Sequence, residues 1–380
     1  MPPVWVRRLV IGPAVVALAI VLLTTLPLWL IVGVAASPLV SGHLRVPRLV
    51  WLAIVYVVWD AAALVALAAL WVASGFGWKI RSPAFQRAHY VLTGRFLGML
   101  FWIARWSLHL DVDVVGTDPD TAVPGRPEIV VSRHAGPGDS FILIHGLVNW
   151  FDREPRIVLK ATLQWDPAVD VLLNRLPNRF ISPGRTGTHT LAQEIGELAT
   201  GLDDNDAFVI FPEGGNFTPR RRIRAIAWLR ARGLKDLAVR AERLRNLLPP
   251  KPGGLLAAID SAPDAGVIFV AHTGLDRMLT VADVWRELPM DKRLVMRFWS
   301  VPPEEVPVGE EARTVWLYDW WARIDAWIEE NRPASRPLST DWAARRGAAV
   351  ASGSAASGPA ASGPAASGPD KAGQGVPGRP

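Results

Sequence analysis

The longest uncharged segment of the chain limits what it can fold into. No Asp, Glu, Lys or Arg occurs in Leu9–Ala36, and about 20 apolar residues are enough to cross the hydrocarbon core of a bilayer. A second apolar run, Leu49–Ser74, is interrupted only by Asp60. A secretory signal peptide is the alternative for the first run, but its apolar core usually has only about 7–15 residues. The sequence therefore predicts two antiparallel transmembrane helices, 9–36 and 49–74.

Basic residues on either side of these runs predict their orientation. Arg7 and Arg8 precede the first run, within a short N-terminus of residues 1–8, and four cations follow the second: Lys79, Arg81, Arg87 and Arg95. Since Lys and Arg are enriched on the cytoplasmic side, we expect a multi-pass protein of the cell membrane with both ends cytoplasmic. Many of the 18 tryptophans lie in or beside this apolar region, as interfacial anchors do.

Asp60 is the one acidic residue in the second run. In an antiparallel hairpin it reaches about the depth of Thr25, and a carboxyl group inside a membrane needs a hydrogen-bonding partner. We expect Asp60 to join the two helices through Thr24 or Thr25 rather than to take part in catalysis.

Beyond the hairpin the pattern changes to alternating strands and helices. Residues 79–108 are predicted to form a linker with an interfacial or core-facing helix at 91–108. After it, buried strands are predicted at 128–132, 156–159, 207–211, 267–271 and 294–300, and helices at 141–151 and 190–200. This alternation predicts a cytoplasmic α/β domain at 109–332.

The end of the chain has two parts. Residues 313–331 predict a helix with a stripe of large side chains, Trp316, Trp320, Ile324 and Trp327, that packs on the core rather than against lipid. The Ala/Ser/Gly/Pro repeats of 345–380 have too little apolar surface to form a core, so this tail is predicted to be disordered.

The chain contains no cysteine, which excludes disulfides, thiolate nucleophiles and cysteine-ligated metals. His145 follows His134 closely enough to reach towards it, but no further ligands at a metal-binding spacing are present. We expect no metal and no cofactor.

The segment IVVSRHAGPGDS at 129–140 is the first candidate for chemistry. A Gly-Pro-Gly turn after the strand allows the carboxylate of Asp139 to meet one imidazole nitrogen of His134, so that the other can accept a proton. A His–Asp pair of this kind suits deprotonation of a substrate hydroxyl. In the alternative interpretation Asp139 only caps the following helix and His134 is an ordinary loop residue.

A second candidate segment, AFVIFPEGGNFT at 207–218, also follows a buried strand. Ligands of α/β sheets bind where strands end, and glycines let backbone N–H groups approach a phosphate. Two such segments, about eighty residues apart, are more specific than either alone.

Together these segments resemble the 1-acylglycerol-3-phosphate acyltransferase family. SRHAGPGDS is similar to its His-x-x-x-x-Asp block and FPEGGNFT to its Phe-Pro-Glu-Gly block, while LKATLQWDP and NRFISPGR resemble its Lys-containing and Phe-Ile-x-Arg segments. LPPKPGGLL resembles a segment of the lysocardiolipin acyltransferase-like branch. The resemblance implies a mixed α/β sheet flanked by helices and preceded by the membrane hairpin.

The resemblance also implies roles for residues. His134 would take the proton from a glycerol hydroxyl, which attacks an acyl thioester, and Asp139 would orient His134. The implied substrate-binding residues are Lys160, Arg179, Arg185, Phe211, Pro212, Glu213, Gly214, Gly215 and Thr218. Which arginine binds phosphate stays open, because the usual Thr-Arg after Glu-Gly is replaced by Gly215 and Asn216. Arg220, Arg221 and Arg222 are close enough in sequence to substitute.

The implied acceptor is 1-acylglycerol-3-phosphate, and the implied co-substrate is acyl-CoA or an acylated acyl carrier protein. Another lysophospholipid, such as lysocardiolipin, is the alternative acceptor. A catalytically silent lipid-binding membrane protein is the alternative from another class, and the intact His134, Asp139 and Glu213 argue against it.

Residues 220–245 are strongly basic, with nine arginines and one lysine against one aspartate and one glutamate. They form either a solvated helix face or a site for anionic headgroups or the phosphates of coenzyme A. Nucleic acid is disfavoured, because the segment has few aromatic stacking partners.

Overall fold

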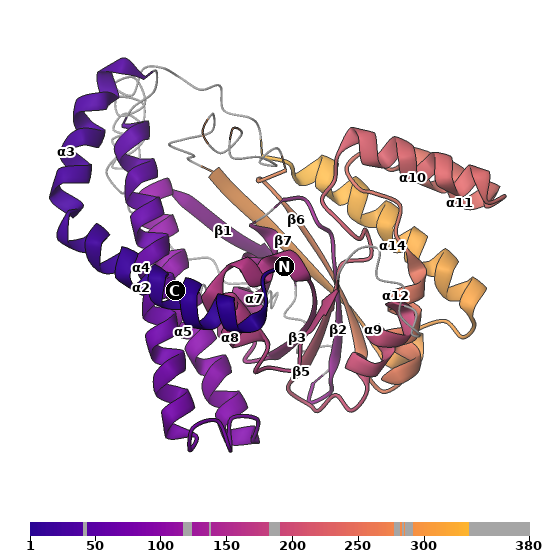
Figure 1. The fold of residues 1–380 in the computed structure, drawn as a ribbon. Coiled ribbons are helices and arrows are strands. Elements are labelled where there is room, and N and C mark those ends of the chain that lie inside the picture. Colours follow the sequence, from indigo (N-terminus) through magenta and orange to yellow (C-terminus); the bar gives the residue numbers. More distant parts are fainter. Residues whose placement is uncertain are drawn as a thin grey trace, which may run out of the picture.

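The centre of the computed structural model is a seven-stranded sheet in the order β1-β7-β6-β2-β5-β3-β4 (Figure 1). The structure describes residues 1–40, 44–116, 124–136, 138–181, 191–276, 282, 285 and 292–333, and only the backbone of Asp139. The strands are β1 Leu110–Val115, β2 Glu128–Ser132, β3 Glu154–Lys160, β4 Arg179–Ile181, β5 Asp206–Ile210, β6 Gly266–Thr273 and β7 Lys292–Val301. β6 and β7 are antiparallel, whereas the other neighbouring pairs are parallel. The mixed α/β sheet is therefore confirmed.

The central strands consist of continuous apolar runs because both of their faces are covered. Every residue of β2, β5 and β6 is buried, as expected for parallel strands inside a sheet. In register, Val130 pairs with Val209 on one side and Ile268 on the other. Since β2, β3, β4, β5 and β6 run in one direction, their carboxyl ends meet at one edge.

Helices cover both faces of this sheet. The helical segments are α1 Val4–Val6, η1 Arg7–Ile11, α2 Gly12–Thr24, α3 Leu26–Ala36, η2 Ser37–Leu39, α4 Arg45–Ala73, α5 Pro83–Leu108, α7 Asp139–Asn149, η3 Ala161–Trp165, α8 Pro167–Leu173, α9 Leu191–Ala199, α10 Pro219–Ala231, α11 Lys235–Arg243, α12 Pro252–Ser261, η4 Pro303–Glu305 and α14 Glu310–Asn331. Ile129 and Val131 pack with α9, α12 and α14, whereas Val130 packs with α7 on the opposite face. The strand period of two explains this division.

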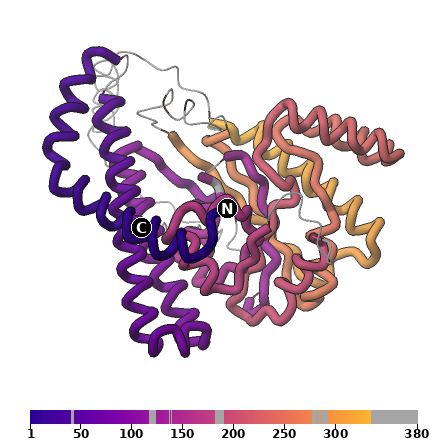
Figure 2. The backbone as a smooth tube through the Cα atoms, in the orientation of Figure 1, coloured from indigo at the N-terminus to yellow at the C-terminus, as the bar shows by residue number. Residues whose placement is uncertain are grey.

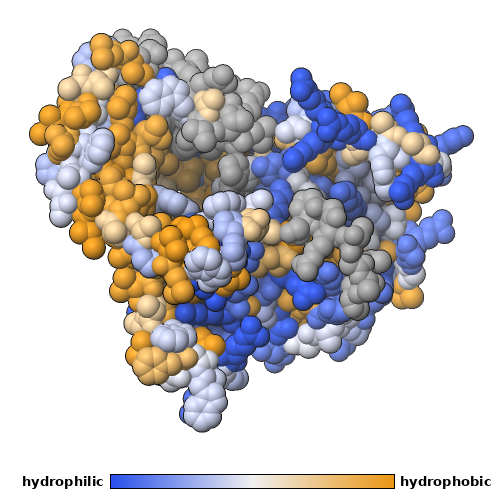
Figure 3. All heavy atoms as spheres, in the orientation of Figure 1, coloured by the Kyte–Doolittle hydropathy of each residue, from blue (hydrophilic) through white to orange (hydrophobic). Residues whose placement is uncertain are grey.

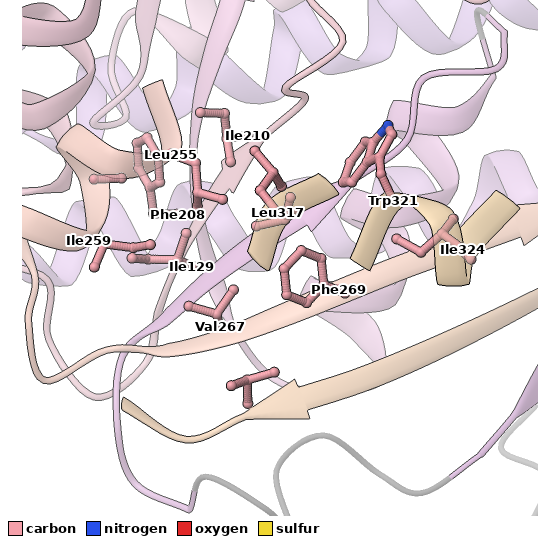
Figure 4. Packing of buried hydrophobic residues seen from close by; sticks show 14 of the residues in the cluster. Ile129, Phe208, Ile210, Leu255, Ile259, Val267, Phe269, Leu317, Trp321 and Ile324 are labelled. Carbon is pink, nitrogen blue, oxygen red and sulfur yellow. The ribbon is translucent and has the colours of Figure 1, made fainter. Parts of the chain in front are cut away.

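The aromatic helix at the end of the domain packs on the core as predicted. Figure 4 shows Leu317 and Ile324 of α14 beside Phe269 of β6. The ring of Trp321 points away from Phe269, and its N–H donates to the carbonyl of Leu248 at 3.1 Å; all three side chains of α14 are fully buried. The Trp320 ring stacks on Phe269 with their centroids 4.5 Å apart. The predicted tail, 345–380, lies outside the described residues.

The first apolar run does not form the single helix that its composition predicts. It is divided at Thr25, and α2 and α3 run in different directions (Figure 1). Pro27 explains the break, because its ring clashes with the carbonyl four residues earlier and it has no N–H to donate. Two helices, Val4–Thr24 with 21 residues and Arg45–Ala73 with 29, have the length and apolar composition needed to cross a membrane. Figure 3 shows apolar side chains gathered over this part of the surface.

The partner predicted for Asp60 is wrong. Its Oδ1 accepts a hydrogen bond from the backbone N–H of Ala168, 3.2 Å away in α8. The hydroxyls of Thr24 and Thr25 instead donate to the carbonyl of Val21. Asp60 thus joins α4 to the α/β domain rather than to the first apolar run.

The N-terminal arginines also bind the domain. Asp170 of α8 is fully buried and accepts from Arg7 at 2.8 Å and from Arg8 at 3.3 Å. Only 5 % of Arg7 is exposed, although its charge normally favours water. These ion pairs place the N-terminus on the same side of the apolar helices as the domain.

We predict that Asp170→Asn strongly destabilises the protein. Removing one partner of a buried ion pair leaves an uncompensated charge and costs about 3–5 kcal/mol. The thermal unfolding midpoint in detergent should fall clearly, and the bonds from Val4 to Ile11 should become more sensitive to protease. Asp264→Asn, which neutralises an exposed aspartate, should change neither. Equal midpoints for the two variants would contradict the importance of this ion pair.

Candidate active site

His134 lies just beyond the buried end of β2 and is held by the loop that follows β5. Its backbone N–H donates to Oε1 of Glu213 at 3.0 Å, and its carbonyl accepts from the N–H of Phe217 at 3.0 Å. The imidazole lies beside the ring of Phe211, with centroids 4.9 Å apart. Because β2 and β5 are adjacent and parallel, the two candidate segments form one site, as their positions after buried strands predict.

Glu213 connects a third segment to this site. Its side chain is 3 % exposed, and Oε2 accepts from the backbone N–H of Leu248 at 3.1 Å. Next to this contact, the N–H of Lys251 donates to the carbonyl of Pro212 at 2.9 Å. A buried carboxylate requires donors of this kind. The observed contacts of Glu213 therefore position the backbone of the site.

Two cations approach the glycines of the same loop. Gly214 has a φ of +66°, and a Cβ placed there would lie 3.1 Å from Nζ of Lys251. A Cβ at Gly215 would lie only 2.8 Å from Nη1 of Arg221. The absence of side chains therefore allows a lysine and an arginine to lie close to the loop that holds His134. Such a cluster suits a phosphate, to which arginine can bind through two parallel hydrogen bonds.

Other predicted site residues lie further from His134 or have structural contacts. Lys160 is exposed at the end of β3, at the same edge. Arg179 begins β4, which is three strands from β2, about 14 Å at the usual strand spacing, and it pairs with Glu194 at 3.4 Å. The hydroxyl of Thr218 accepts from the N–H of Arg221 and caps α10.

Two predicted residues lie partly or wholly outside the described part of the chain. The backbone of Asp139 begins α7, with Gly138 as the N-cap residue, but its side chain lies outside the described residues. Arg185 falls within 182–190, which also lies outside them.

His145 packs among residues of α5 and α7. It lies within α7, where its ring stacks on Phe101 with the centroids 4.4 Å apart and its Nδ1 is 2.7 Å from the Asn149 amide nitrogen. Burial among these groups lowers the pKa of His145 to about 4, so the ring is neutral at physiological pH. Within the described residues, no three His, Cys, Asp or Glu side chains lie close enough together to hold a metal ion.

A buried ion pair beside His134 is not predicted from the sequence. Arg133 is 2 % exposed and donates to the carbonyl of His272 at 2.7 Å and to Asp276 at 2.5 Å. The Thr273 hydroxyl also donates to Asp276. Burial raises the pKa of Asp276, but the charge of Arg133 and the hydrogen bonds outweigh it and lower this pKa to about 2. The pair fixes the chain after β6 next to the chain after β2.

Lys251 is a second residue of the site that the sequence does not predict. It lies in the LPPKPGGLL segment, which resembles a family motif, but its proximity to Gly214 depends on how the loops meet at the edge of the sheet. Of the three arginines that the sequence offers for phosphate binding after this loop, Arg220, Arg221 and Arg222, it is Arg221 that lies against a loop glycine. Arg222 turns away and donates to the carbonyls of Glu242 and Leu244.

Comparison with known proteins supports an acyltransferase. Residues 113–274 match the family model described as Acyltransferase, and this segment contains every predicted site residue. A search of curated proteins finds no significant match. Among solved structures, the chain is similar to the 1-acyl-sn-glycerophosphate (LPA) acyltransferase PlsC from Thermotoga maritima, with 15 % identity and a TM-score of 0.42 over 66 % of this chain and 81 % of that one. The family match confirms the prediction that the chain contains an acyltransferase domain.

We predict that Asp276→Asn destabilises the protein by about 3–5 kcal/mol, because it leaves the buried charge of Arg133 unpaired. The folded-state pKa of Asp276 lies below its ordinary value of 3.8. The wild-type contribution is therefore complete above pH 3.8 and is lost as the pH falls towards 2. Thermal midpoints measured between pH 6 and pH 2 should converge for wild type and variant at the acidic end.

Asp260→Asn is the matched control for this prediction. Asp260 pairs with Arg313 at the surface, where 67 % of its side chain is exposed, so its loss should cost less than about 1 kcal/mol. If Asp276→Asn were as mild as this control near neutral pH, the Arg133–Asp276 pair would not stabilise the site.

Proposed function

We propose that the chain transfers a fatty acyl group from an acyl thioester to the free sn-2 hydroxyl of 1-acylglycerol-3-phosphate, giving phosphatidic acid. Its matched domain is an acyltransferase domain. The observation that carries the proposal is the position of His134. Both of its backbone groups are bonded to the Phe211–Phe217 loop, and two cations flank the glycines of that loop.

In the proposed reaction, the imidazole of His134 accepts the proton of the glycerol hydroxyl. The oxygen attacks the thioester carbonyl, a new ester bond forms as the carbon–sulfur bond breaks, and the thiol leaves with a proton from the imidazolium. Histidine suits this step because it is the side chain that most often acts as a general base. Asp139 would orient the imidazole, as the family resemblance implies. Acyl-CoA or an acylated carrier protein supplies the thioester.

The phosphate of the acceptor would lie against Lys251 and Arg221. Their cationic ends lie against the glycines of the loop that holds His134. Arg179 instead pairs with Glu194 and lies on β4, three strands from β2. Because Gly214 and Gly215 have no side chains, the cationic ends of Lys251 and Arg221 lie close to the loop, where both can donate to a phosphate. Lys160 and Arg185 stay candidates for the thioester or for the remainder of the acceptor.

We also propose that α2, α3 and α4 hold the domain at the cytoplasmic face of the cell membrane. Two apolar helices have sufficient length to cross it, and lipid substrates are delivered there. The contacts of Arg7 and Arg8 with Asp170 support a common side for the N-terminus and the domain. α8 packs against one face of α4, where Asp60 accepts a hydrogen bond from the backbone N–H of Ala168.

His134→Ala should abolish acyl transfer, with a loss of about 10²–10⁴-fold in kcat, because general-base catalysis contributes a factor of this size. The assay follows labelled acyl-CoA, and separately acyl carrier protein, with a panel of lysophospholipids that includes lysocardiolipin. His109→Asn is the control. His109 is exposed and precedes β1, which is three strands from β2 in the sheet, and its φ of +50° is tolerated by asparagine.

Equal incorporation by wild type and His134→Ala would exclude this mechanism. Preference for lysocardiolipin would replace the acceptor that we propose, while absence of transfer from every thioester to every lysophospholipid would favour a silent lipid-binding protein.

Lys251→Met should raise the KM for 1-acylglycerol-3-phosphate about tenfold or more and change kcat little, because a hydrogen bond to a charged group contributes about 1.5–3 kcal/mol. Arg221→Gln should act in the same direction. Arg179→Gln is the comparison and should have a smaller effect. A larger effect of Arg179→Gln on KM would move the phosphate site to β4.

A further inference from the structure

The segment after the active-site loop forms a basic hairpin, which we define as α10 and α11 with their connecting turn, Pro219–Arg243. Figures 1 and 2 show it at the periphery of the molecule, beside α14. One of its faces is packed: Ile226, Leu229, Ala238 and Ala241 are buried together with Tyr318 of α14. Arg240 also pairs with Asp319. The hairpin is therefore a fixed part of the domain with a second, outward face.

The outward face of α10 carries a stripe of mixed character. Arg220, Ile223, Arg224, Ala227 and Trp228 follow the spacing i, i+3, i+4, i+7, i+8, and all are exposed. Ile223 is 65 % and Trp228 51 % exposed, although both side chains are large and apolar. The guanidinium of Arg232 lies 4.4 Å from the centroid of the Trp228 ring. Cationic and apolar side chains alternate along this stripe, and no element in the described part of the chain covers them.

The charge of the hairpin exceeds what its own contacts neutralise. The hairpin, Pro219–Arg243, carries a net charge of +7, whereas the whole chain carries +6. Arg230 pairs with Glu242 at 2.6 Å, and Arg222 donates to the carbonyls of Glu242 and Leu244. In the described part of the chain, Arg220 and Arg224 have no hydrogen bond or ion pair. These two arginines are therefore available to an external anion.

We propose that the outward stripe of α10 docks on the surface of an anionic phospholipid bilayer. Arginines at the surface attract anionic headgroups, while an isoleucine and a tryptophan on the same face can enter the boundary between headgroups and acyl chains. A free phosphate compound would use the arginines but not Ile223 or Trp228. The alternation of charge and apolar area therefore fits a lipid surface better than a soluble anion.

The position of the stripe agrees with this partner. Thr218 caps α10, and Phe217, one residue earlier, donates to the carbonyl of His134. From Arg220 to Trp228 the helix rises about 12 Å. A bilayer that contacts this stripe therefore lies near the edge of the sheet at which His134 is held. The contact is separate from α2, α3 and α4 in the chain and does not depend on the acyl-transfer reaction.

The absence of cysteine from the chain allows a direct test. Ile223→Cys in the full chain is labelled with an environment-sensitive fluorophore and placed in nanodiscs of phosphatidylcholine or of equimolar phosphatidylcholine and phosphatidylglycerol. We expect a blue shift and stronger emission only with phosphatidylglycerol, weakened by 1 M salt, which shortens the Debye length to about 3 Å. Val308→Cys, at a position 90 % exposed, is the control and should not respond.

A charge variant tests the role of the arginines. Arg220→Gln with Arg224→Gln in the labelled protein should remove at least half of the emission change. Arg126→Gln with Arg293→Gln lowers the net charge equally at exposed positions outside the hairpin and should leave the change intact. Equal losses in both would indicate that net charge, rather than the stripe, attracts the lipid and would overturn the proposal.

Three further results would also overturn it. The first is a label at position 223 that behaves like the label at 308 with phosphatidylglycerol. The second is a response to coenzyme A in phosphatidylcholine nanodiscs, which would assign the stripe to the thioester donor. The third is a response to an acidic acyl carrier protein but not to anionic lipid, which would assign it to a protein partner. None of these readouts measures acyl transfer, so they are independent of the outcome for His134→Ala.

Discussion

The site depends on one buried carboxylate. Glu213 accepts the backbone N–H groups of His134 and Leu248, and so joins the segments that follow β2 and β5 to the segment before α12. An unpaired N–H in such a place costs about 1–3 kcal/mol, so the three segments can keep their positions only together. The backbone of His134 is therefore positioned by a residue from a distant part of the sequence, and its ring lies beside that of Phe211.

The polar side chains of the site fall into two sets: one holds the loops in place, and the other is positioned to bind an anion. Arg133 and Asp276 neutralise each other inside the domain, and Glu213 binds backbone groups, so these strongly polar side chains fix the loops. Lys251 and Arg221 have their cationic ends near glycines that offer no side chain of their own. Cations positioned in this way by bonded loops need little reorganisation when an anion binds, which is the condition under which electrostatic stabilisation is most effective.

The apolar N-terminal helices are tied to the domain by polar contacts that are equally specific. Asp170 binds Arg7 and Arg8, and Asp60 binds the backbone of α8. Sequence patterns assign Arg7 and Arg8 to membrane orientation and Asp60 to helix pairing. In the structure all three side chains bind the domain. Together with the basic hairpin, which lies at the opposite side of the sheet (Figure 1), they give the domain two different surfaces suited to lipid.

Sequence patterns alone were enough to predict five of the seven strands, β2, β3, β5, β6 and β7, and the positions of the two motifs. Continuous apolar runs predict β2, β5 and β6, because buried parallel strands need apolar side chains on both faces, and His134 and Glu213 follow directly from where those runs end. Pro27 could also have predicted the break at Thr25. The cations near His134, the partner of Asp60 and the buried partner of Arg133 are instead set by contacts between distant segments. These contacts depend on the strand order, which is not sequential and is fixed by packing across the whole sheet rather than by local sequence.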